Sequence, residues 1–284
     1  MMEQIECRYQ SYKIIVYHKP GKTDEKVVFL HGGGLDSAMM SWQEVIAEMG
    51  DEYELYAIDL LGYGASDKPD VTYSLQMYTE LLHNVLGQLG IHKASFAGLS
   101  MGGGVSLAFA LKYPQMVEKL TLVDALGLYE RMPHFHYLCW KFVNSHWNEK
   151  AYDWFRKSRK LVRWSASELI GDKKKLTDEF VESLYKLVLE PGCGKPFISF
   201  QRQELGRKKL TTGLACRLGE LRMPVLLVNG EKDSSVPAKA AIAASKVIPN
   251  CRLHIMKGCK HWSQKERPEE FAEVFRDFLQ SGNK

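Results

Sequence analysis

The apolar residues of this chain form two kinds of pattern that alternate along most of its length. Short continuous apolar runs are typical of buried strands, whereas apolar positions three to four residues apart are typical of helices that pack on a sheet. Helical spacing predicts helices at residues 42–49, 75–89, 105–112 and 238–247. Continuous runs predict strands at residues 26–31, 55–60, 93–97, 120–124, 224–230 and 252–256, after a hairpin at 5–8 and 13–18. The alternation predicts an α/β fold with a mostly parallel sheet between layers of helices.

The alternation stops between about residue 128 and residue 222. Only helical patterns remain there, at residues 137–147, 151–164 and 178–189, and they are rich in aromatic and basic residues. We therefore expect one α/β core, formed by residues 1–127 and 223–284, that is interrupted by a helical insertion of residues 128–222.

One short motif lies where a predicted strand turns into a predicted helix. Gly98-Leu99-Ser100-Met101-Gly102 follows the apolar run at 94–97 and precedes the helical run at 105–112. In that context Gly-x-Ser-x-Gly predicts a sharp turn that raises the serine hydroxyl above the sheet, beside the N–H groups of a helix start. Glycine at both ends lets neighbouring chain pass without meeting a Cβ. Ser100 is therefore a candidate nucleophile.

A serine nucleophile needs a histidine base and a carboxylate that orients the base. Asp233 lies in the polar loop after the strand at 224–230, and His261 lies in the loop after the strand at 252–256. Because the carboxyl ends of parallel strands meet at one edge of a sheet, both side chains are expected near Ser100. Asp124, at the end of the strand at 120–124, is the alternative carboxylate.

Five segments in this order resemble the α/β-hydrolase superfamily, and they extend over nearly the whole chain. They are Phe29-Leu30-His31-Gly32-Gly33-Gly34, Asp59-Leu60-Leu61-Gly62-Tyr63-Gly64-Ala65-Ser66, Gly98-Leu99-Ser100-Met101-Gly102-Gly103, Gly230-Glu231-Lys232-Asp233 and His261-Trp262-Ser263-Gln264-Lys265-Glu266-Arg267-Pro268. Within the superfamily, the segment that begins at His261 and the glycines after His31 most resemble the meta-cleavage-product hydrolases, which break carbon–carbon bonds. The chain is also similar to small bacterial carboxylesterases.

The resemblance implies an α/β-hydrolase fold: an eight-stranded, mostly parallel sheet, with residues 128–222 as a helical cap over the active site. It implies Ser100 as nucleophile, His261 as general base and then acid, and Asp233 as the orienting carboxylate, with no cofactor and no metal. The backbone N–H groups of Gly33 and Met101 would form the oxyanion hole. Further expectations place Gly34 and Trp262 against the substrate, the side chains of Met101 and Met39 or Met40 in the apolar wall, and His31 beneath the oxyanion loop.

Two departures from the carbon–carbon hydrolases bear on the reaction. Those enzymes usually continue the glycine run with Pro-Gly, where this chain has Leu35-Asp36. They also hold an anionic dienoate with a cap arginine, for which Arg202 and Arg207 are candidates by position alone. We therefore expect hydrolysis of small or medium carboxylic esters through an acyl-enzyme. The alternatives are carbon–carbon hydrolysis of a vinylogous diketo acid and a weakly catalytic ligand receptor. Ser100 argues against the epoxide hydrolases and haloalkane dehalogenases, which have an aspartate at that position.

Charge is unevenly distributed along the chain. Residues 128–222 carry a net charge of +8 and the remainder a net charge of −4. A basic cap could attract an anionic substrate or an acidic surface, and aromatic residues interleaved with Arg156, Lys157, Arg159 and Lys160 leave transient lipid contact open. No nucleic-acid-binding motif is present, and His134-Phe135-His136 has no third residue with which to hold a metal.

The remaining expectations concern location and assembly. No apolar run is long enough to span a membrane, and the N-terminus does not resemble a signal peptide. The six cysteines never form a Cys-x-x-Cys pair, which favours free thiols in a reducing compartment. We expect a cytoplasmic enzyme that acts on a small-molecule ester. It is expected to bind no nucleic acid and not to insert stably into a membrane, and a homodimer is a possible assembly.

Overall fold

The sheet of the protein has eight strands in the computed structural model, which describes residues 2–132 and 135–282. Their order is β1-β2-β4-β3-β5-β6-β7-β8. From β4 onward all neighbours are parallel, whereas β1 and β2 extend one edge as antiparallel strands. The strands are β1 (Glu3–Tyr9), β2 (Tyr12–Lys19), β3 (Lys26–Leu30), β4 (Glu54–Ile58), β5 (Ala94–Leu99), β6 (Val117–Val123), β7 (Val225–Gly230) and β8 (Cys251–Met256). The predicted mostly parallel sheet is confirmed.

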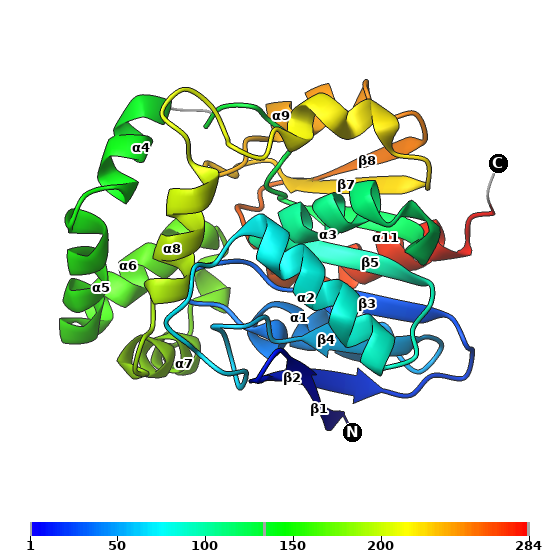
Figure 1. Ribbon diagram of the computed structural model, residues 1–284, viewed down its shortest axis with the longest axis horizontal. Helices are drawn as coiled ribbons and strands as arrows, with labels where there is room; N and C mark the ends of the chain where they lie inside the picture. Colours follow the sequence, from blue (N-terminus) through cyan, green and yellow to red (C-terminus); the bar gives the residue numbers. More distant parts are fainter. Residues whose placement is uncertain (1, 133–134, 283–284) are drawn as a thin grey trace.

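Helices cover both faces of this sheet (Figure 1). Two separate hydrophobic clusters result, one beneath α2 and α3 and the other beneath α1 and α11. Every residue of β5 is buried, so this central strand lies between the two clusters. The helices of the core are α1 (Ala38–Glu48), α2 (Leu75–Gln88), α3 (Met101–Lys112), α9 (Ala238–Ser245), the short α10 (Ser263–Glu266) and α11 (Pro268–Gln280).

Among the described residues, five further α-helices lie between β6 and β7 in the sequence and beside one end of the sheet in space (Figure 1). Backbone and side-chain bonds join them to the core: Trp262 N–H donates to the carbonyl of Leu169 at 3.0 Å, and Lys260 Nζ donates to the carbonyl of Ser167 at 2.6 Å. The helices are α4 (His136–Val143), α5 (Trp147–Lys157), α6 (Arg159–Leu169), α7 (Asp178–Leu189) and α8 (Lys195–Glu204). The division into a core and a cap domain at residues 128 and 222 stays a prediction.

The predicted helices of the insertion differ from the observed ones where the chain changes direction. Residues 151–164 were expected to form one helix, but Ser158 has an extended backbone that ends α5 and begins α6. Its hydroxyl accepts the N–H of Leu161, which is the role of an N-cap residue. The helix expected at 137–147 ends at Val143, and Trp147 begins α5 instead. The pattern also missed α8, α10, α11 and three short 3₁₀ helices, Pro114–Met116, Lys173–Lys175 and Leu214–Glu220.

Two further observations concern the chain as a whole. Among the residues that the structure describes, no helix has the length and apolar character needed to cross a membrane. Cys7, Cys193, Cys216, Cys251 and Cys259 all carry free thiols. Burial raises the pKa of the Cys7 thiol and raises that of Cys193 to about 11 and that of Cys259 to about 12, so these groups stay protonated near neutral pH.

The cluster beneath α1 and α11 provides a test of the fold. The ring of Phe275 is fully buried, 6.1 Å from the ring of Phe29 and 5.6 Å from that of Phe271. We expect Phe275→Ala to lower the free energy of unfolding by about 3–5 kcal/mol, because it removes these contacts and leaves a cavity. Urea denaturation measures the change, with Ile242→Ala on the exposed side of α9 as the control. A loss below about 1 kcal/mol for Phe275→Ala would contradict this packing.

Candidate active site

Ser100 forms the turn between β5 and α3 with a strained backbone, at φ +50° and ψ −112°. The turn is held by main-chain bonds, because Ser100 N–H donates to the carbonyl of Val123 and the Ser100 carbonyl accepts the N–H of Leu126, both at 2.9 Å. A Cβ at Gly98 would lie 2.4 Å from the Gly102 carbonyl oxygen, and one at Gly102 would lie 2.4 Å from that of His31. The two glycines are therefore needed for this turn, as the motif predicted.

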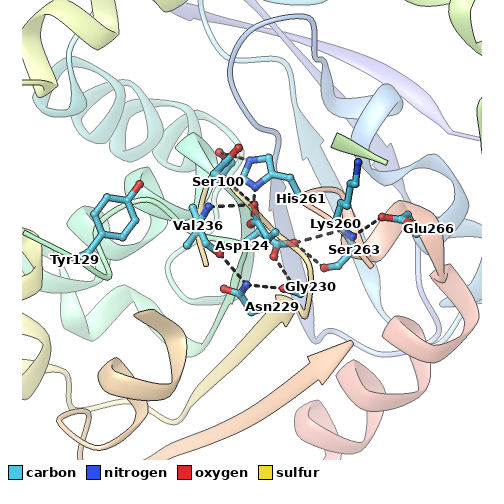
Figure 2. A network of polar contacts seen from close by, with 12 residues as sticks. Ser100, Asp124, Tyr129, Asn229, Gly230, Val236, Lys260, His261, Ser263 and Glu266 are labelled. Atoms are coloured by element: carbon cyan, nitrogen blue, oxygen red, sulfur yellow. Dashed lines mark hydrogen bonds and ion pairs between the residues drawn. The ribbon is translucent and has the colours of Figure 1, made fainter. Parts of the chain in front are cut away.

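The side chains of Ser100, His261 and Asp233 meet at the carboxyl ends of β5, β7 and β8. Figure 2 shows Ser100 and His261 of this group. His261 Nδ1 lies 2.7 Å from Asp233 Oδ2, and His261 Nε2 lies 2.9 Å from Ser100 Oγ. Asp233 Oδ1 accepts the N–H groups of Ser235 and Val236, which fixes the carboxylate. In the neutral imidazole, Nδ1 therefore donates to Asp233 and Nε2 is left to accept a proton from Ser100. This arrangement can activate a serine hydroxyl.

The electrostatics of His261 suit a base. Burial by itself disfavours the charged imidazolium, but the charge of Asp233 and its hydrogen bond outweigh this effect, and the pKa of His261 is raised. A raised pKa makes the ring a stronger proton acceptor. The same pair also holds the ring in one orientation, because Nδ1 is tied to a carboxylate that is itself buried.

The alternative carboxylate, Asp124, is buried, and its hydrogen bonds among the described residues go to groups other than His261. Its Oδ1 accepts the N–H of Gly230 at 2.7 Å, and its Oδ2 accepts the hydroxyl of Ser263 at 2.6 Å (Figure 2). Burial, followed by repulsion from Asp233, raises the pKa of Asp124 well above its ordinary value. The structure therefore brings Asp233, not Asp124, to the imidazole, and Asp124 joins the loops after β6, β7 and β8.

Asp124, Asp233 and His261 also form the cluster to consider for a metal, because one ligand atom from each lies within 4.8 Å of the others. All of these atoms have hydrogen-bond partners: Gly230 and Ser263 for Asp124, two backbone N–H groups for Asp233, and Asp233 and Ser100 for His261. A cation would have to displace those bonds. The arrangement fits a serine–histidine–carboxylate chain better than a metal site.

The residues of the predicted oxyanion hole, Gly33 and Met101, line the same cavity as Ser100. Met101 is the first residue of α3, so its N–H has no acceptor within the helix. The hydrogen bonds of the described residues also include no acceptor for the N–H of Gly33. The loop that carries Gly33 is held by Asp36, whose Oδ2 accepts the N–H of Gly32 at 2.7 Å and whose carboxylate also accepts the hydroxyl of Ser41. Asp36 is buried, and this burial raises its pKa despite its hydrogen bonds. No sequence pattern indicated this role of Asp36.

His31 lies beneath the same loop, as expected. Its Nε2 accepts the N–H of Leu60 at 3.1 Å, so the proton is on Nδ1, which donates to the carbonyl of Gly32 at 2.7 Å. Both nitrogens are thus used to connect two loops, and the ring is fully buried against Tyr63.

A cavity of about 720 Å³ extends from Ser100 and His261 between the sheet and the helical insertion. Gly34, Met101 and Trp262 belong to its lining. The expected contact of Gly34 and Trp262 with a substrate stays a prediction. The suggestion that Met39 or Met40 contributes is wrong, because both residues lie in α1 and neither lines the cavity. The aromatic residues of the lining come mostly from the insertion: Tyr129, Phe135, Phe142, Tyr152, Phe155, Phe197 and Phe200.

The two candidate cap arginines do not reach the cavity. Arg202 bonds the carbonyls of Val143 and Ser145 and forms an ion pair with Glu149. The guanidinium of Arg207 lies over the rings of Tyr137 and Trp140. In the part of the chain that the structure describes, no lysine or arginine lines the cavity. Positions 133–134 are outside the described residues, so the pairing suggested by His134 and His136 is not tested; His136 itself bonds Met132 N–H and the Gly206 carbonyl.

Among the described residues, one acidic residue lines the cavity, and no sequence pattern indicated it. Glu204, at the end of α8, is buried, and this burial raises its pKa to about 7, although the hydroxyl of Thr212 donates to it at 2.5 Å. Only the fold of the insertion brings this carboxyl group into the cavity wall. Near neutral pH it is about half ionised, so the cavity gains negative charge as the pH rises.

Comparison with known proteins agrees with this architecture. A family model described as alpha/beta hydrolase fold matches residues 26–268. The chain belongs to this family. The hydrolase is 28% identical over 258 residues to 2-hydroxymuconate semialdehyde hydrolase of Pseudomonas sp. (strain CF600), a match that covers 89% of this chain and 86% of that one. It is 27% identical to Epoxide hydrolase 1 of Caenorhabditis elegans, over 98% of this chain and 71% of that one.

The fold of the hydrolase is also found among solved structures. It matches the meta-cleavage product hydrolase from Pseudomonas fluorescens IP01 (CumD) with a TM-score of 0.80 and 23% identity, and the match covers 96% of each chain. The two relatives above have similar identities but are named for different reactions. The reaction of this hydrolase therefore has to be argued from its own site.

The carboxylate beside His261 can be tested without any substrate. We expect the pKa of His261 to lie above its ordinary value of about 6.5 and to fall in Asp233→Asn, because burial then acts without the opposing charge. NMR titration of the imidazole measures both values. Asp124→Asn, which leaves the bond between His261 and Asp233 in place, should change the pKa less. A larger fall in Asp124→Asn would show that the assignment of the partner is wrong.

Proposed function

We propose that this protein is a serine hydrolase that cleaves uncharged, largely apolar carboxylic esters through an acyl-enzyme. The observation that carries the proposal is the chemistry of the cavity beside Ser100 and His261. Its described lining is mostly apolar, has no lysine or arginine, and includes the carboxyl group of Glu204. Such a wall favours a neutral ester over an anionic substrate, because a carboxylate buried without a positive partner loses its hydration without compensation.

The reaction follows from the hydrogen bonds of the site. Ser100 Oγ attacks the ester carbonyl while its proton passes to His261 Nε2, and Asp233 stabilises the resulting imidazolium. The oxyanion would accept the N–H groups of Gly33 and Met101. The imidazolium then protonates the leaving alcohol. A water molecule, deprotonated by His261, attacks the acyl-enzyme and releases the acid and free Ser100. The chemistry needs no metal or cofactor.

Small or medium acyl groups are the proposed substrates. Gly34 and Trp262 are proposed to contact the ester, since both lie in the wall of the same cavity. Close packing limits the space at Gly33, where an added Cβ would lie 2.3 Å from the ring of Phe197. A side chain there would have to displace this ring from the cavity wall.

The second candidate is carbon–carbon bond hydrolysis of a diketo acid. The similarity to 2-hydroxymuconate semialdehyde hydrolase favours it, and the comparisons support it better than they support an esterase. The same three side chains could begin that reaction. Against it, Arg202 and Arg207 are engaged outside the cavity and leave a substrate carboxylate without a charge-assisted partner. A weakly catalytic receptor is the third candidate, and no structural feature favours it.

A cytoplasmic location is part of the proposal. The free thiols of Cys193 and Cys216 support a reducing compartment, because extracellular domains more often use cysteines in disulfides. A homodimer is not needed for the site, since Ser100, His261 and Asp233 all come from one chain.

The nucleophile provides the first test. We expect Ser100→Ala to abolish covalent labelling by a fluorophosphonate and to lower ester turnover by on the order of 10⁴–10⁶, because no other hydroxyl group is bonded to His261 Nε2 among the described residues. Labelling is read on a gel and turnover with p-nitrophenyl esters. Ser263→Ala is the control for a nearby buried serine. Labelling that persists in Ser100→Ala would refute the assignment, and labelling without turnover of any ester would favour the receptor.

The charge of the cavity separates the two reactions. We expect neutral short-chain esters to be hydrolysed with a higher kcat/KM than 2-hydroxymuconate semialdehyde. Glu204→Gln should lower KM for esters that carry a carboxylate, but only above about pH 7, where the wild-type carboxyl group is ionised. KM for neutral esters is the internal control. If kcat/KM for 2-hydroxymuconate semialdehyde exceeded that for the best ester by about a hundredfold, the activation barriers would differ by ~2.7 kcal/mol. Carbon–carbon hydrolysis would then replace the proposed reaction.

A further inference from the structure

The exposed aromatic residues of this protein are confined to one part of the chain. Among the residues that the structure describes, every exposed phenylalanine, tyrosine or tryptophan lies between positions 135 and 164. The exposed large apolar residues of the core are aliphatic and scattered: Ile242, Val247 and Leu253. Isolated apolar residues are ordinary on a protein surface, whereas a concentration of aromatic ones indicates a binding surface.

Helix α5 has an outer stripe that alternates aromatic and basic residues. Trp147, Lys150, Trp154 and Lys157 are spaced by three, four and three positions, which places them on one side of the helix, and all four are exposed. Lys150 Nζ lies 4.7 Å from the ring centroid of Trp147. The opposite side carries the buried Tyr152, which lines the cavity. Helix α5 therefore covers the cavity on its inner side and exposes tryptophan and lysine on its outer side.

Helix α4 extends this surface to the opening of the cavity. Leu138 and Phe142 are 58% and 46% exposed, yet both also line the cavity. Lys141 lies between them in the sequence and is exposed. Helices α4 and α5 follow one another along the outer edge of the insertion (Figure 1). We call the exposed residues Leu138, Lys141, Phe142, Trp147, Lys150, Trp154 and Lys157 the α4–α5 surface.

The charge of this region selects an anionic partner. Residues 135–164 contain seven lysines and arginines but two acidic residues, Glu149 and Asp153. Both acids are paired with arginines, Arg202 and Arg156. In the described part of the chain, Lys141, Lys150 and Lys157 have no acidic partner. Their charges are therefore available to a negatively charged surface.

We propose that the α4–α5 surface docks the enzyme reversibly on an anionic lipid bilayer. Tryptophan and phenylalanine insert at the boundary between headgroups and acyl chains, and lysines between them contact anionic headgroups. A bilayer fits this surface better than an acidic protein does, because Leu138 and Phe142 join it to the apolar cavity. On the proposed esterase function, an amphiphilic ester in the bilayer would then reach Ser100 from the membrane side.

Vesicle sedimentation with the full-length protein tests the proposal. We expect binding to vesicles of phosphatidylcholine mixed with phosphatidylglycerol, little binding to phosphatidylcholine alone, and release by added salt. Lys150→Gln combined with Lys157→Gln should weaken binding to the anionic vesicles by on the order of tenfold or more. Trp147→Ala combined with Trp154→Ala should weaken it as well. Neither pair lines the cavity, so turnover of a soluble p-nitrophenyl ester should stay unchanged.

The control is a pair of exposed lysines at α9, Lys239→Gln with Lys246→Gln, which removes the same charge away from α4 and α5 (Figure 1). The proposal would be overturned if the α5 variants and the wild type bound anionic vesicles equally well, or if the wild type did not bind anionic vesicles at all. A dimer in light scattering that both α5 variants abolish would assign the surface to a second copy of the chain instead. Turnover of the soluble ester tests the esterase function independently of membrane docking. If the wild type does not hydrolyse the ester, the esterase function is refuted, whereas the vesicle-binding result still decides the docking proposal.

Discussion

A serine held at φ +50° is unfavourable for its backbone, and only the packing around the turn can keep it there. In this protein the support comes from three sides. The Ser100 N–H bonds the end of β6, the helix α3 begins at the next residue, and the main chain of Gly102 passes against the carbonyl of His31. The loop of Gly33 and the turn of Ser100 are therefore fixed relative to each other, which is the requirement for a nucleophile and an oxyanion hole that act on one carbonyl.

Buried carboxylates complete this arrangement, each with a different task. Asp36 holds the loop of Gly32 and Gly33, Asp124 joins the loops after β6, β7 and β8, and Asp233 orients His261. Burial of a carboxylate is costly unless hydrogen bonds replace its hydration, and all three accept at least two such bonds. Their positions at the ends of parallel strands explain why this edge of the sheet carries the chemistry.

The helical insertion forms most of the cavity wall beside that chemistry. It supplies most of the aromatic wall and Glu204, while Arg202 of α8 pairs with Glu149 of α5 and Arg156 pairs with Asp153 within α5. The same helices expose tryptophan and lysine to the outside. One segment thus has apolar residues in the cavity wall and exposed tryptophan and lysine outside it. None of the lysines and arginines that give residues 128–222 a net charge of +8 belongs to the described lining of the cavity.

The sequence by itself determined the fold and the residues of the candidate site, because both depend on local patterns. Apolar runs placed all eight strands, and the motif around Ser100, together with the loops of Asp233 and His261, placed the three side chains before any distance was known. The choice between Asp124 and Asp233 needed the tertiary structure, since both follow strands and only geometry shows which one faces the imidazole.

The tertiary structure also decided the breaks between the insertion helices and the composition of the cavity. Periodicity placed the break between α4 and α5 too late in the chain and did not separate α5 from α6. Ser158 ends α5 by its extended backbone and caps α6. No sequence pattern indicated the roles of Glu204, Asp36 and Phe197. Glu204 and Phe197 reach the cavity wall only through the fold of the insertion, and Asp36 bonds Gly32 and Ser41 only because the loop after β3 folds back on itself. Sequence patterns report which side of an element is apolar, and packing alone determines what that side meets.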